Sequence, residues 1–393
     1  MALTDALAGQ ALPAALIDRA ALDHNVEVVR SRLPEGLTLR VATKSVRNLS
    51  ALKHILAGLG DRAHGLMCYA PAEVAFLAGR GHHDLLLAYP VARAADAAPL
   101  VAAAQAGARV AVVCDAEAQL AVLSAAAREG DAGLDVVIDI DGSLRGPGVH
   151  LGVRRSPLRA PEQAVALARA VARSPGLTLR GLMLYEAQVA GTRDHDPHQP
   201  LLDPVRRWIR RRSRPLARDR RVAVRAALEA DGHEVSLVNG GGTGSLDSSS
   251  HDGSCTEVTA GSAFYCPHLF DGCGLPLRPA AFFALAVTRS SDAGWVTVAG
   301  GGFVASGAAG ADRLPVVHAP EGLACAALEG FGEVQTPLRW RGDGAAPRPG
   351  DVVLCRHAKA GELCERFEEL LVIAADEVVD RWPTYRGEGL CAP

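Results

Sequence analysis

Eight short apolar runs, separated by helical segments, constrain the fold of this chain more than any other feature. Each run is compact enough to be a buried parallel strand. They occupy residues 37–43, 64–67, 84–88, 109–114, 135–140, 179–185, 234–239 and 256–260. Residues 22–33, before the first run, carry a single apolar helix face. Eight strand–helix units in about 250 residues predict a (β/α)8 barrel of the TIM type, and a doubly wound open sheet is the alternative.

The sequence changes character after Pro276. Strand-like pieces, separated by Gly, Pro and Asp turns, lie at 282–289, 294–298, 314–318, 351–355 and 369–374. This pattern predicts a mainly β domain. We therefore expect the barrel over residues 20–275 and the β domain over 276–393, with residues 1–19 joining the latter. A long insertion spans 192–221, and we interpret its arginine-rich run 206–221 as a solvated helix face rather than a polyanion site.

Charge and cysteine usage limit the partners and the compartment. The net charge is −3, which gives no sign of a nucleic-acid or membrane partner. No run of 18 apolar residues and no signal peptide is recognisable. The nine cysteines include no CxxC pair, which is typical of a reduced protein. We expect a cytoplasmic protein.

Lys44 ends the first predicted strand, in the run Arg40-Val-Ala-Thr-Lys44. In a (β/α)8 barrel the carboxyl ends of the strands face the active-site mouth, so a lysine here faces the chemistry. A desolvated lysine loses its proton more readily and becomes an imine-forming nucleophile. A strand-end lysine is also commonly a solvated surface residue, so this interpretation depends on the loops described next.

Two loops of small residues follow the last two predicted strands, at 239–244 (Asn-Gly-Gly-Gly-Thr-Gly) and at 259–262 (Thr-Ala-Gly-Ser). Consecutive glycines let backbone N–H groups converge on an anion, and a hydroxyl adds another donor. Barrels commonly hold a phosphate at these two positions. The alternative is a pair of flexible turns, but the position of both loops favours a phosphate site.

Taken together, these motifs resemble the fold-type III pyridoxal-phosphate enzymes, the superfamily of the alanine racemase N-terminal domain. The resemblance rests on Lys44, on the paired loops and on the run Asp141-Gly-Ser-Leu-Arg145. Arg40-Val-Ala-Thr-Lys44 and Thr256-Glu257…Gly261…Tyr265 resemble motifs of the D-threonine aldolase and D-serine dehydratase branch. The resemblance covers the barrel and reaches into the C-terminal region.

The resemblance implies a role for each matching residue. Lys44 would carry pyridoxal 5′-phosphate as a Schiff base and move the proton at the α-carbon. Arg145 would lie near the phenolic oxygen of the cofactor, and Tyr185 near its ring. The remaining expected cofactor contacts are Asn239, Gly241, Gly242, Thr243, Gly261, Ser262 and Tyr265, of which Tyr265 either faces the substrate or packs in the core.

Two departures from the family pattern concern the chemistry. Where the aldolases have a histidine for the proton of the substrate's β-hydroxyl, this chain has Gln188, which hydrogen-bonds but cannot act as a base. His195 and His198 are possible substitutes, and the alternative is that both are solvated loop residues.

The second departure concerns a divalent metal, zinc or manganese, which this branch binds through His-x-Asp or His-x-Cys. His357 matches the first ligand, but Lys359 stands at the second position, and an ammonium repels a metal ion. Cys364 or Glu362 could complete a site of different geometry. Alternatively the ammonium of Lys359 replaces the metal and binds the substrate, and this is the interpretation we favour.

The resemblance therefore implies a homodimeric lyase that cleaves a β-hydroxy amino acid, expected to be of D configuration. Both aldolase-type Cα–Cβ cleavage and dehydratase-type loss of the hydroxyl stay open. An amino-acid racemase is the alternative enzyme, with Tyr265 of the partner subunit as a candidate for its second acid or base. The same motifs would also suit a non-catalytic pyridoxal-phosphate carrier or, more remotely, a cofactor-free sugar-phosphate barrel enzyme.

Overall fold

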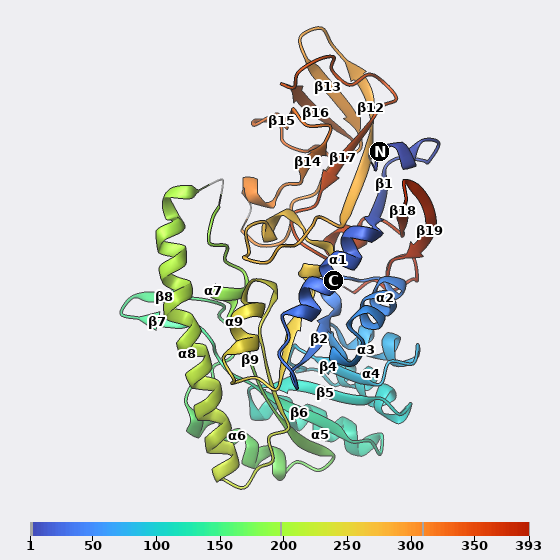
Figure 1. Cartoon of the computed structure of the whole chain (residues 1–393). Coiled ribbons are helices and arrows are strands. Elements are labelled where there is room, and N and C mark those ends of the chain that lie inside the picture. Colours follow the sequence, from blue (N-terminus) through green and yellow to red (C-terminus); the bar gives the residue numbers. More distant parts are fainter. Residues whose placement is uncertain (1–2, 197–198, 309, 393) are drawn as a thin grey trace.

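A closed barrel of eight parallel strands forms the larger part of the computed structural model, which describes residues 3–196, 199–308 and 310–392 (Figure 1). Its strands, in spatial order, are β10 (Leu237–Gly240), β11 (Glu257–Ala260), β2 (Thr38–Ala42), β3 (Ala63–Cys68), β4 (Asp84–Leu87), β5 (Arg109–Cys114), β6 (Leu134–Asp139) and β9 (Leu177–Leu184). All eight predicted strands are present, so the predicted barrel is confirmed and the open sheet is excluded.

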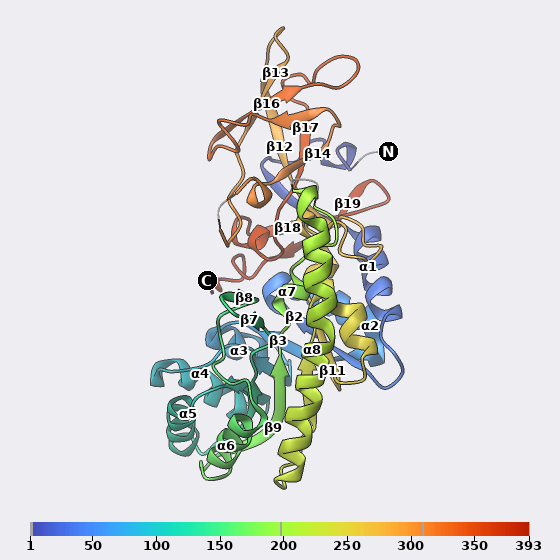
Figure 2. The same ribbon diagram turned by 90° about the vertical axis from the view of Figure 1, so that its left-hand side faces the viewer.

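Helices cover the outside of the barrel (Figures 1 and 2). They are α1 (Arg19–Ser31), α2 (Leu49–Leu59), α3 (Pro71–Ala78), α4 (Ala94–Gln105), α5 (Glu117–Glu129), α6 (Pro161–Ala172), α8 (Asp203–Ala230) and the short α7 (Ala187–Ala190), α9 (Leu246–His251) and α10 (Ser262–Tyr265). The start of α2 is capped by Asn48, whose Oδ1 accepts a hydrogen bond from the Ala51 N–H at 2.9 Å. Because Asn48 caps its first turn, α2 begins shortly after the turn that carries Lys44.

A second sheet of nine strands lies beyond the carboxyl ends of the barrel strands (Figure 1). Its main path runs β15 (Leu323–Cys325), β16 (Gln335–Trp340), β13 (Trp295–Ala299), β12 (Ala281–Ser290), β1 (Ala14–Asp18), β18 (Glu369–Ala374) and β19 (Glu377–Pro383), and β17 (Val352–Arg356) joins β12 to β14 (Val316–Ala319). The N-terminal strand β1 pairs with β12 and β18. The mainly β region expected after the barrel is confirmed, although β15, β16 and β19 were not predicted.

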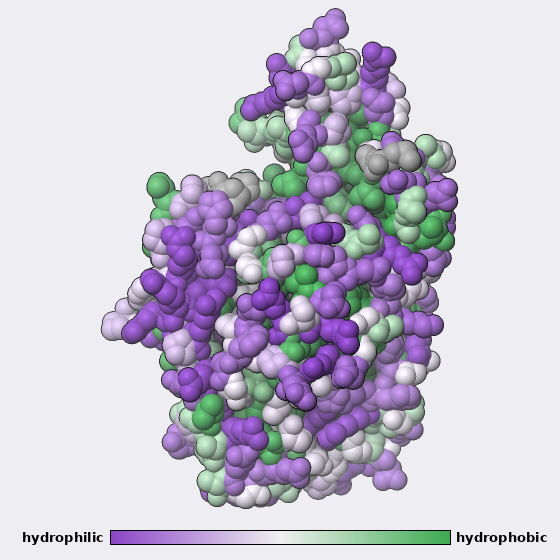
Figure 3. Space-filling view, viewed as in Figure 1, coloured by the Kyte–Doolittle hydropathy of each residue, from purple (hydrophilic) through white to green (hydrophobic). Residues whose placement is uncertain are grey.

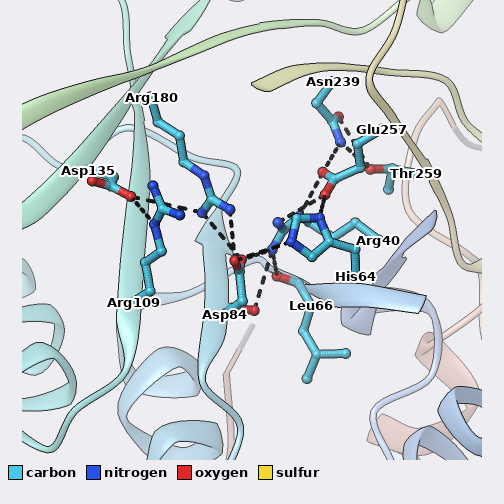
Figure 4. Close-up of polar contacts among 10 residues, drawn as sticks. All are labelled: Arg40, His64, Leu66, Asp84, Arg109, Asp135, Arg180, Asn239, Glu257 and Thr259. Carbon is cyan, nitrogen blue, oxygen red and sulfur yellow. Dashed lines mark hydrogen bonds and ion pairs between the residues drawn. The ribbon is translucent and has the colours of Figure 1, made fainter. Parts of the chain in front are cut away.

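Inside the barrel, an apolar layer separates the strand ends at the mouth from a charged layer at the opposite end. The apolar layer consists of Leu86, Ala111, Val113, Val137, Met183 and Leu237. Below it, the fully buried Arg40 binds both oxygens of Glu257, at 2.7 and 3.0 Å, and Asp84 at 2.6 Å (Figure 4). Removing one partner of such a buried pair typically costs ~3–5 kcal/mol. Arg40 therefore stabilises the barrel interior on the side of the apolar layer that is away from the mouth.

Asp84 makes the stability of this layer pH-dependent. Burial alone raises its pKa, but Arg180 and Arg40 outweigh burial and lower the pKa to about 2 from the usual 3.8. Because the folded-state pKa lies below that of the unfolded chain, Asp84 stabilises the fold at neutral pH. This contribution, about 2 kcal/mol, is lost as the pH falls from about 4 to about 2.

We therefore expect the free energy of unfolding to fall more steeply over this pH range in the unmodified protein than in Asp84→Asn. Urea denaturation at a series of pH values measures the difference. Equal slopes in the two proteins would show that the pair with Arg180 and Arg40 does not stabilise the fold.

Helix α8 stands along the side of the barrel and forms most of one edge of the molecule (Figures 1 and 2). It contains most of the insertion expected at 192–221, and its outward face is largely hydrophilic (Figure 3). Within the described ranges, none of the helices combines the length and apolar character needed to cross a membrane.

Candidate active site

Lys44 lies in a single helical turn, Thr43–Ser45, directly after β2. Its Nζ donates a hydrogen bond to the Tyr89 hydroxyl at 3.3 Å. A loop from the second sheet rests on this turn, because a Cβ at Gly361 would lie only 1.8 Å from the Lys44 carbonyl oxygen. Gly361 also has φ +81°, so both its space and its conformation require glycine. The second sheet therefore closes over the lysine.

A cavity of about 190 Å³ lies at the mouth of the barrel, and Lys44 is part of its wall. Nine of the predicted site residues line it: Lys44, Tyr185, Asn239, Gly241, Gly242, Thr243, Gly261, Ser262 and Lys359. The barrel contributes the first eight, and the loop after β17 contributes Lys359. Segments from opposite ends of the sequence thus meet in one cavity.

The two glycine-rich loops are linked to each other and to the lysine turn. The Thr243 hydroxyl accepts a hydrogen bond from the Ala263 N–H at 3.0 Å, which joins the loop after β10 to the loop after β11. Ser262 Oγ lies 3.2 Å from Ser45 Oγ, which joins the second loop to the turn of Lys44. A Cβ at Gly242 would lie 2.8 Å from the Ala190 Cβ, so a larger residue would not fit there. The loops therefore form a narrow pocket bordered by backbone and hydroxyl groups.

Lys359 lines the same cavity, from the loop after β17. Its Nζ donates to Ser306 Oγ at 2.6 Å, and Ser306 N–H in turn donates to Glu362 at 3.0 Å. Burial lowers the pKa of Lys359, the charge of Glu362 opposes this, and the nearby charge of Lys44 lowers it further. The Glu362 carboxylate, a candidate metal ligand, therefore accepts a hydrogen bond from the Ser306 backbone.

Arg155 and Tyr89 also line the cavity, although neither was predicted from the sequence. The guanidinium carbon of Arg155 lies 5.7 Å from the ring centre of Tyr185 and 6.0 Å from that of Tyr89. Burial raises the pKa of Tyr185 to about 12, and the charge of Glu186 adds to the effect, so the phenol stays neutral near pH 7. The position of Tyr89, just after β4 at the mouth of the barrel, was a signal that the sequence did contain.

Arg145, Gln188 and Tyr265 are not among the residues that line the cavity. Arg145 lies in the hairpin of β7 (Leu144–Gly146) and β8 (Val149–Leu151) and pairs with Asp141 at 2.8 Å. The Gln188 amide donates to the Gly142 carbonyl at 2.8 Å. Tyr265 is fully buried and its hydroxyl donates to the Val46 carbonyl at 3.0 Å, so it packs inside its own chain.

His195, the candidate histidine that the structure describes, is not among the residues that line the cavity. The His195 ring nitrogen Nδ1 lies 2.6 Å from Asp203 Oδ2, and the side chain is largely exposed. His198 lies outside the described residues.

The candidate metal ligands His357 and Cys364 are both fully buried. The Cys364 thiol donates to the Val46 carbonyl at 3.3 Å, and burial raises its pKa to about 12. Burial lowers the pKa of His357 to about 3. In the part of the chain that the structure describes, no three His, Cys, Asp or Glu side chains gather into a group that could hold a metal ion.

The closed barrel, the lysine turn at its mouth and the covering second sheet define a barrel protein with a cavity between its two parts. A family model described as "Alanine racemase, N-terminal domain" matches residues 17–267, and the chain belongs to this family. The alanine racemase-like fold family uses pyridoxal phosphate.

The chain is also similar in sequence to a known aldolase. Over 251 residues the chain is 27% identical to the 3-hydroxy-D-aspartate aldolase of Paracoccus denitrificans strain Pd 1222. The match covers 64% of this chain and 59% of that relative, so it spans less than two thirds of the relative's length.

Two solved structures share the fold over nearly the whole chain. The D-threonine aldolase of Filomicrobium marinum has a TM-score of 0.80 at 24% identity, covering 96% of this chain and 95% of that one. The D-threo-3-hydroxyaspartate dehydratase of Delftia sp. HT23 has a TM-score of 0.76 at 20% identity, covering 97% and 99%. At these identities the likeness concerns the fold.

Proposed function

We propose that this protein is a pyridoxal-phosphate-dependent lyase acting on a β-hydroxy D-amino acid, with the cofactor attached to Lys44. The observation that carries the proposal is that Lys44 lines the same cavity as both glycine-rich loops. The names of the relatives, an aldolase and a dehydratase of β-hydroxy D-amino acids, support the reaction class.

The donors around the cavity fit the cofactor. The hydroxyls of Thr243 and Ser262 and the backbone of Gly242 belong to two loops that line it and are joined by the hydrogen bond from the Ala263 N–H to Thr243, so their donors can serve one phosphate. Lys44 provides a primary amine for the carbonyl carbon. When bound, the cofactor would supply an electron sink for the pair released at the substrate's α-carbon.

The chain's own residues have distinct tasks in this proposal. Lys44 holds the cofactor and, once its amine is free, exchanges the proton at the α-carbon. The neutral phenol of Tyr185 and the guanidinium of Arg155 orient the ring and the substrate carboxylate. Gln188, in α7, donates to the Gly142 carbonyl and so holds the loop after β6 against α7. Lys359 binds the substrate's hydroxyl or side-chain carboxylate as a cation.

The charge of the cavity favours an anionic substrate. Lys44, Arg155 and Lys359 line it, and the described lining residues include no Asp, Glu or His. With Lys44 committed to the cofactor, two cations are left for the substrate, whereas one α-carboxylate needs a single partner. We therefore infer that a dicarboxylic substrate, such as 3-hydroxy-D-aspartate, is bound better than D-threonine.

The racemase and the non-catalytic carrier have less support. A racemase needs a second acid or base opposite Lys44, and Tyr265, the candidate for it, is buried in its own chain with its hydroxyl bonded to Val46. A carrier has no need of a residue such as Lys359, which reaches the cavity from the second sheet. Dimerisation and a cytoplasmic location stay predictions.

A panel of D- and L-β-hydroxy amino acids with product identification tests the proposal. Aldolase chemistry yields glycine and an aldehyde or oxo acid, whereas dehydratase chemistry yields ammonia and a 2-oxo acid. Exchange of enantiomers without either product set would contradict the lyase proposal and favour the racemase.

Replacing Thr243 or Ser262 by alanine is expected to weaken cofactor binding more than it slows turnover at saturating cofactor. Each hydroxyl would donate one charge-assisted hydrogen bond to the phosphate, worth ~1.5–3 kcal/mol, or about 10- to 150-fold in the dissociation constant. Absorbance titration of the apoprotein measures this constant. Ser248→Ala is the control, because the Ser248 hydroxyl donates to the Ser245 carbonyl and Ser248 is not among the residues that line the cavity. Unchanged affinity in both site variants would show that the phosphate binds elsewhere.

A further inference from the structure

The arginine-rich helix α8 has a buried side that faces the barrel mouth. The prediction that residues 206–221 form a solvated face is wrong for Arg210 and Arg221, which are buried. The helix packs against α6, α7 and β9 (Figure 2). These arginines therefore point toward the strand ends that surround the candidate site.

Three arginines of α8 donate to backbone carbonyls after three neighbouring strands. Arg220 donates to Asp141 O, after β6. Arg221 donates to Leu184 O at 3.0 Å, at the end of β9. Arg210 donates to Gly244 O at 3.0 Å, in the glycine-rich loop after β10. The helix thus holds the loops of three strands in a fixed relation to one another.

Glu186 connects this helix to the glycine-rich loop. Its carboxylate forms an ion pair with Arg221, and both side chains are almost fully buried. The same carboxylate accepts hydrogen bonds from Ser245 Oγ at 2.7 Å, Ser249 Oγ at 2.6 Å and the Gly241 N–H at 3.4 Å. All three of these donors follow β10, so one buried carboxylate ties the loop and the start of α9 to α8.

The first glycine of the loop makes room for this arrangement. A Cβ at Gly240 would lie 2.4 Å from Nη2 of Arg221. Gly240 therefore admits the guanidinium next to a loop whose residues, Gly240 and Gly242 included, line the cavity. A buried carboxylate that accepts several hydrogen bonds and an ion pair is held in one geometry, which suits Glu186 to fixing the loop.

We propose that Glu186 and Arg221 are positioning residues that hold the loop 240–245 in the conformation that binds the cofactor's phosphate. The inference rests on the proposed function, because it assigns the phosphate to this loop. It gives the inserted helix α8 a task at the candidate site, although its arginines do not line the cavity.

The test compares two ligands of each apoprotein variant: pyridoxal 5′-phosphate and pyridoxal, which has the same ring and carbonyl but no phosphate. The dissociation constant of pyridoxal divided by that of pyridoxal 5′-phosphate, here called the phosphate ratio, measures how much the phosphate contributes to binding. In Glu186→Gln and in Ser245→Ala/Ser249→Ala we expect this ratio to fall at least about tenfold, with pyridoxal affinity unchanged. Arg211→Ala, an exposed arginine of the same helix, should leave both constants unchanged.

A double variant separates positioning from stability. Replacing both members of a buried pair commonly preserves stability. Glu186→Leu/Arg221→Met removes both charges of the buried pair at once, and Asp252, the other acidic partner of Arg221, keeps its hydrogen bonds from Ser254. We expect its melting temperature to stay near that of the unmodified protein while its phosphate ratio stays low. A ratio equal to that of the unmodified protein, or equal weakening of both ligands, would overturn the inference. An unmodified protein that binds neither ligand would instead contradict the proposed function.

Discussion

Lys44→Ala is expected to lose turnover of any β-hydroxy amino acid substrate by at least about 10³-fold, because one amine both holds the cofactor and moves the α-proton. The cofactor should remain bound through its phosphate but lose its covalent attachment. Borohydride reduction of the unmodified protein, followed by peptide mapping, locates the attachment. The chain has only three lysines, Lys44, Lys53 and Lys359, so the map has three possible answers.

The identity of the labelled lysine is decisive because two of the three face the cavity. Lys53→Ala, on the exposed side of α2, is the matched control and should keep full activity. A pyridoxyl label on Lys359 would show that Lys359 holds the cofactor, and Lys44 would then be the lysine that binds the substrate. A label on Lys53, or none, would contradict the cofactor assignment altogether.

Lys359→Ala is expected to lower kcat/KM for 3-hydroxy-D-aspartate by about 10- to 150-fold, the loss of one charge-assisted hydrogen bond of ~1.5–3 kcal/mol. The effect on D-threonine should be smaller, because it lacks the second carboxylate. Activity of the unmodified protein should survive exhaustive chelation. Because the pKa of Lys359 lies below its ordinary value of 10.5, the ammonium is lost as the pH rises through that lowered pKa. Binding of the dicarboxylic substrate should weaken there.

Two variants at the same position separate an ammonium from a metal. Lys359→Arg keeps the positive charge and should retain part of the preference for the dicarboxylic substrate. Lys359→Asp creates a His-x-Asp pair with His357, and its activity should respond to added divalent metal. Elemental analysis of the active unmodified protein gives the opposing outcome. A stoichiometric metal, removable with loss of turnover, would contradict the role of the ammonium.

The barrel could be predicted because its signal is local. A parallel strand buried on both faces is a continuous apolar run, and all eight runs became strands, with β5 at the predicted bounds of 109–114. Because the carboxyl ends of parallel strands face one mouth, the same register placed Lys44 beside the loops after β10 and β11. The short strands β15 and β16 escaped prediction because their sequences have weak patterns and depend on antiparallel partners.

The arginine that lines the cavity, Arg155, could not be identified from local sequence. Arg145 matches the family motif, but a hairpin of β7 and β8 carries it to Asp141 and Ser143 instead. Arg155 lies ten residues later, after the hairpin, and borders the cavity. The sequence contains four arginines from 145 to 159, and nothing local distinguishes the one that reaches Tyr89 and Tyr185.

The sequence by itself determined the eight barrel strands, the lysine at the first strand end and the two glycine-rich loops, because hydrophobic period and turn residues act over a few positions. Only the tertiary structure decided that Gly361 packs on the turn of Lys44, that Lys359 faces the cavity and that Arg221 is buried beneath Gly240. Each of these contacts joins segments far apart in the chain. Their chemistry depends on burial and charge, which residue spacing does not encode.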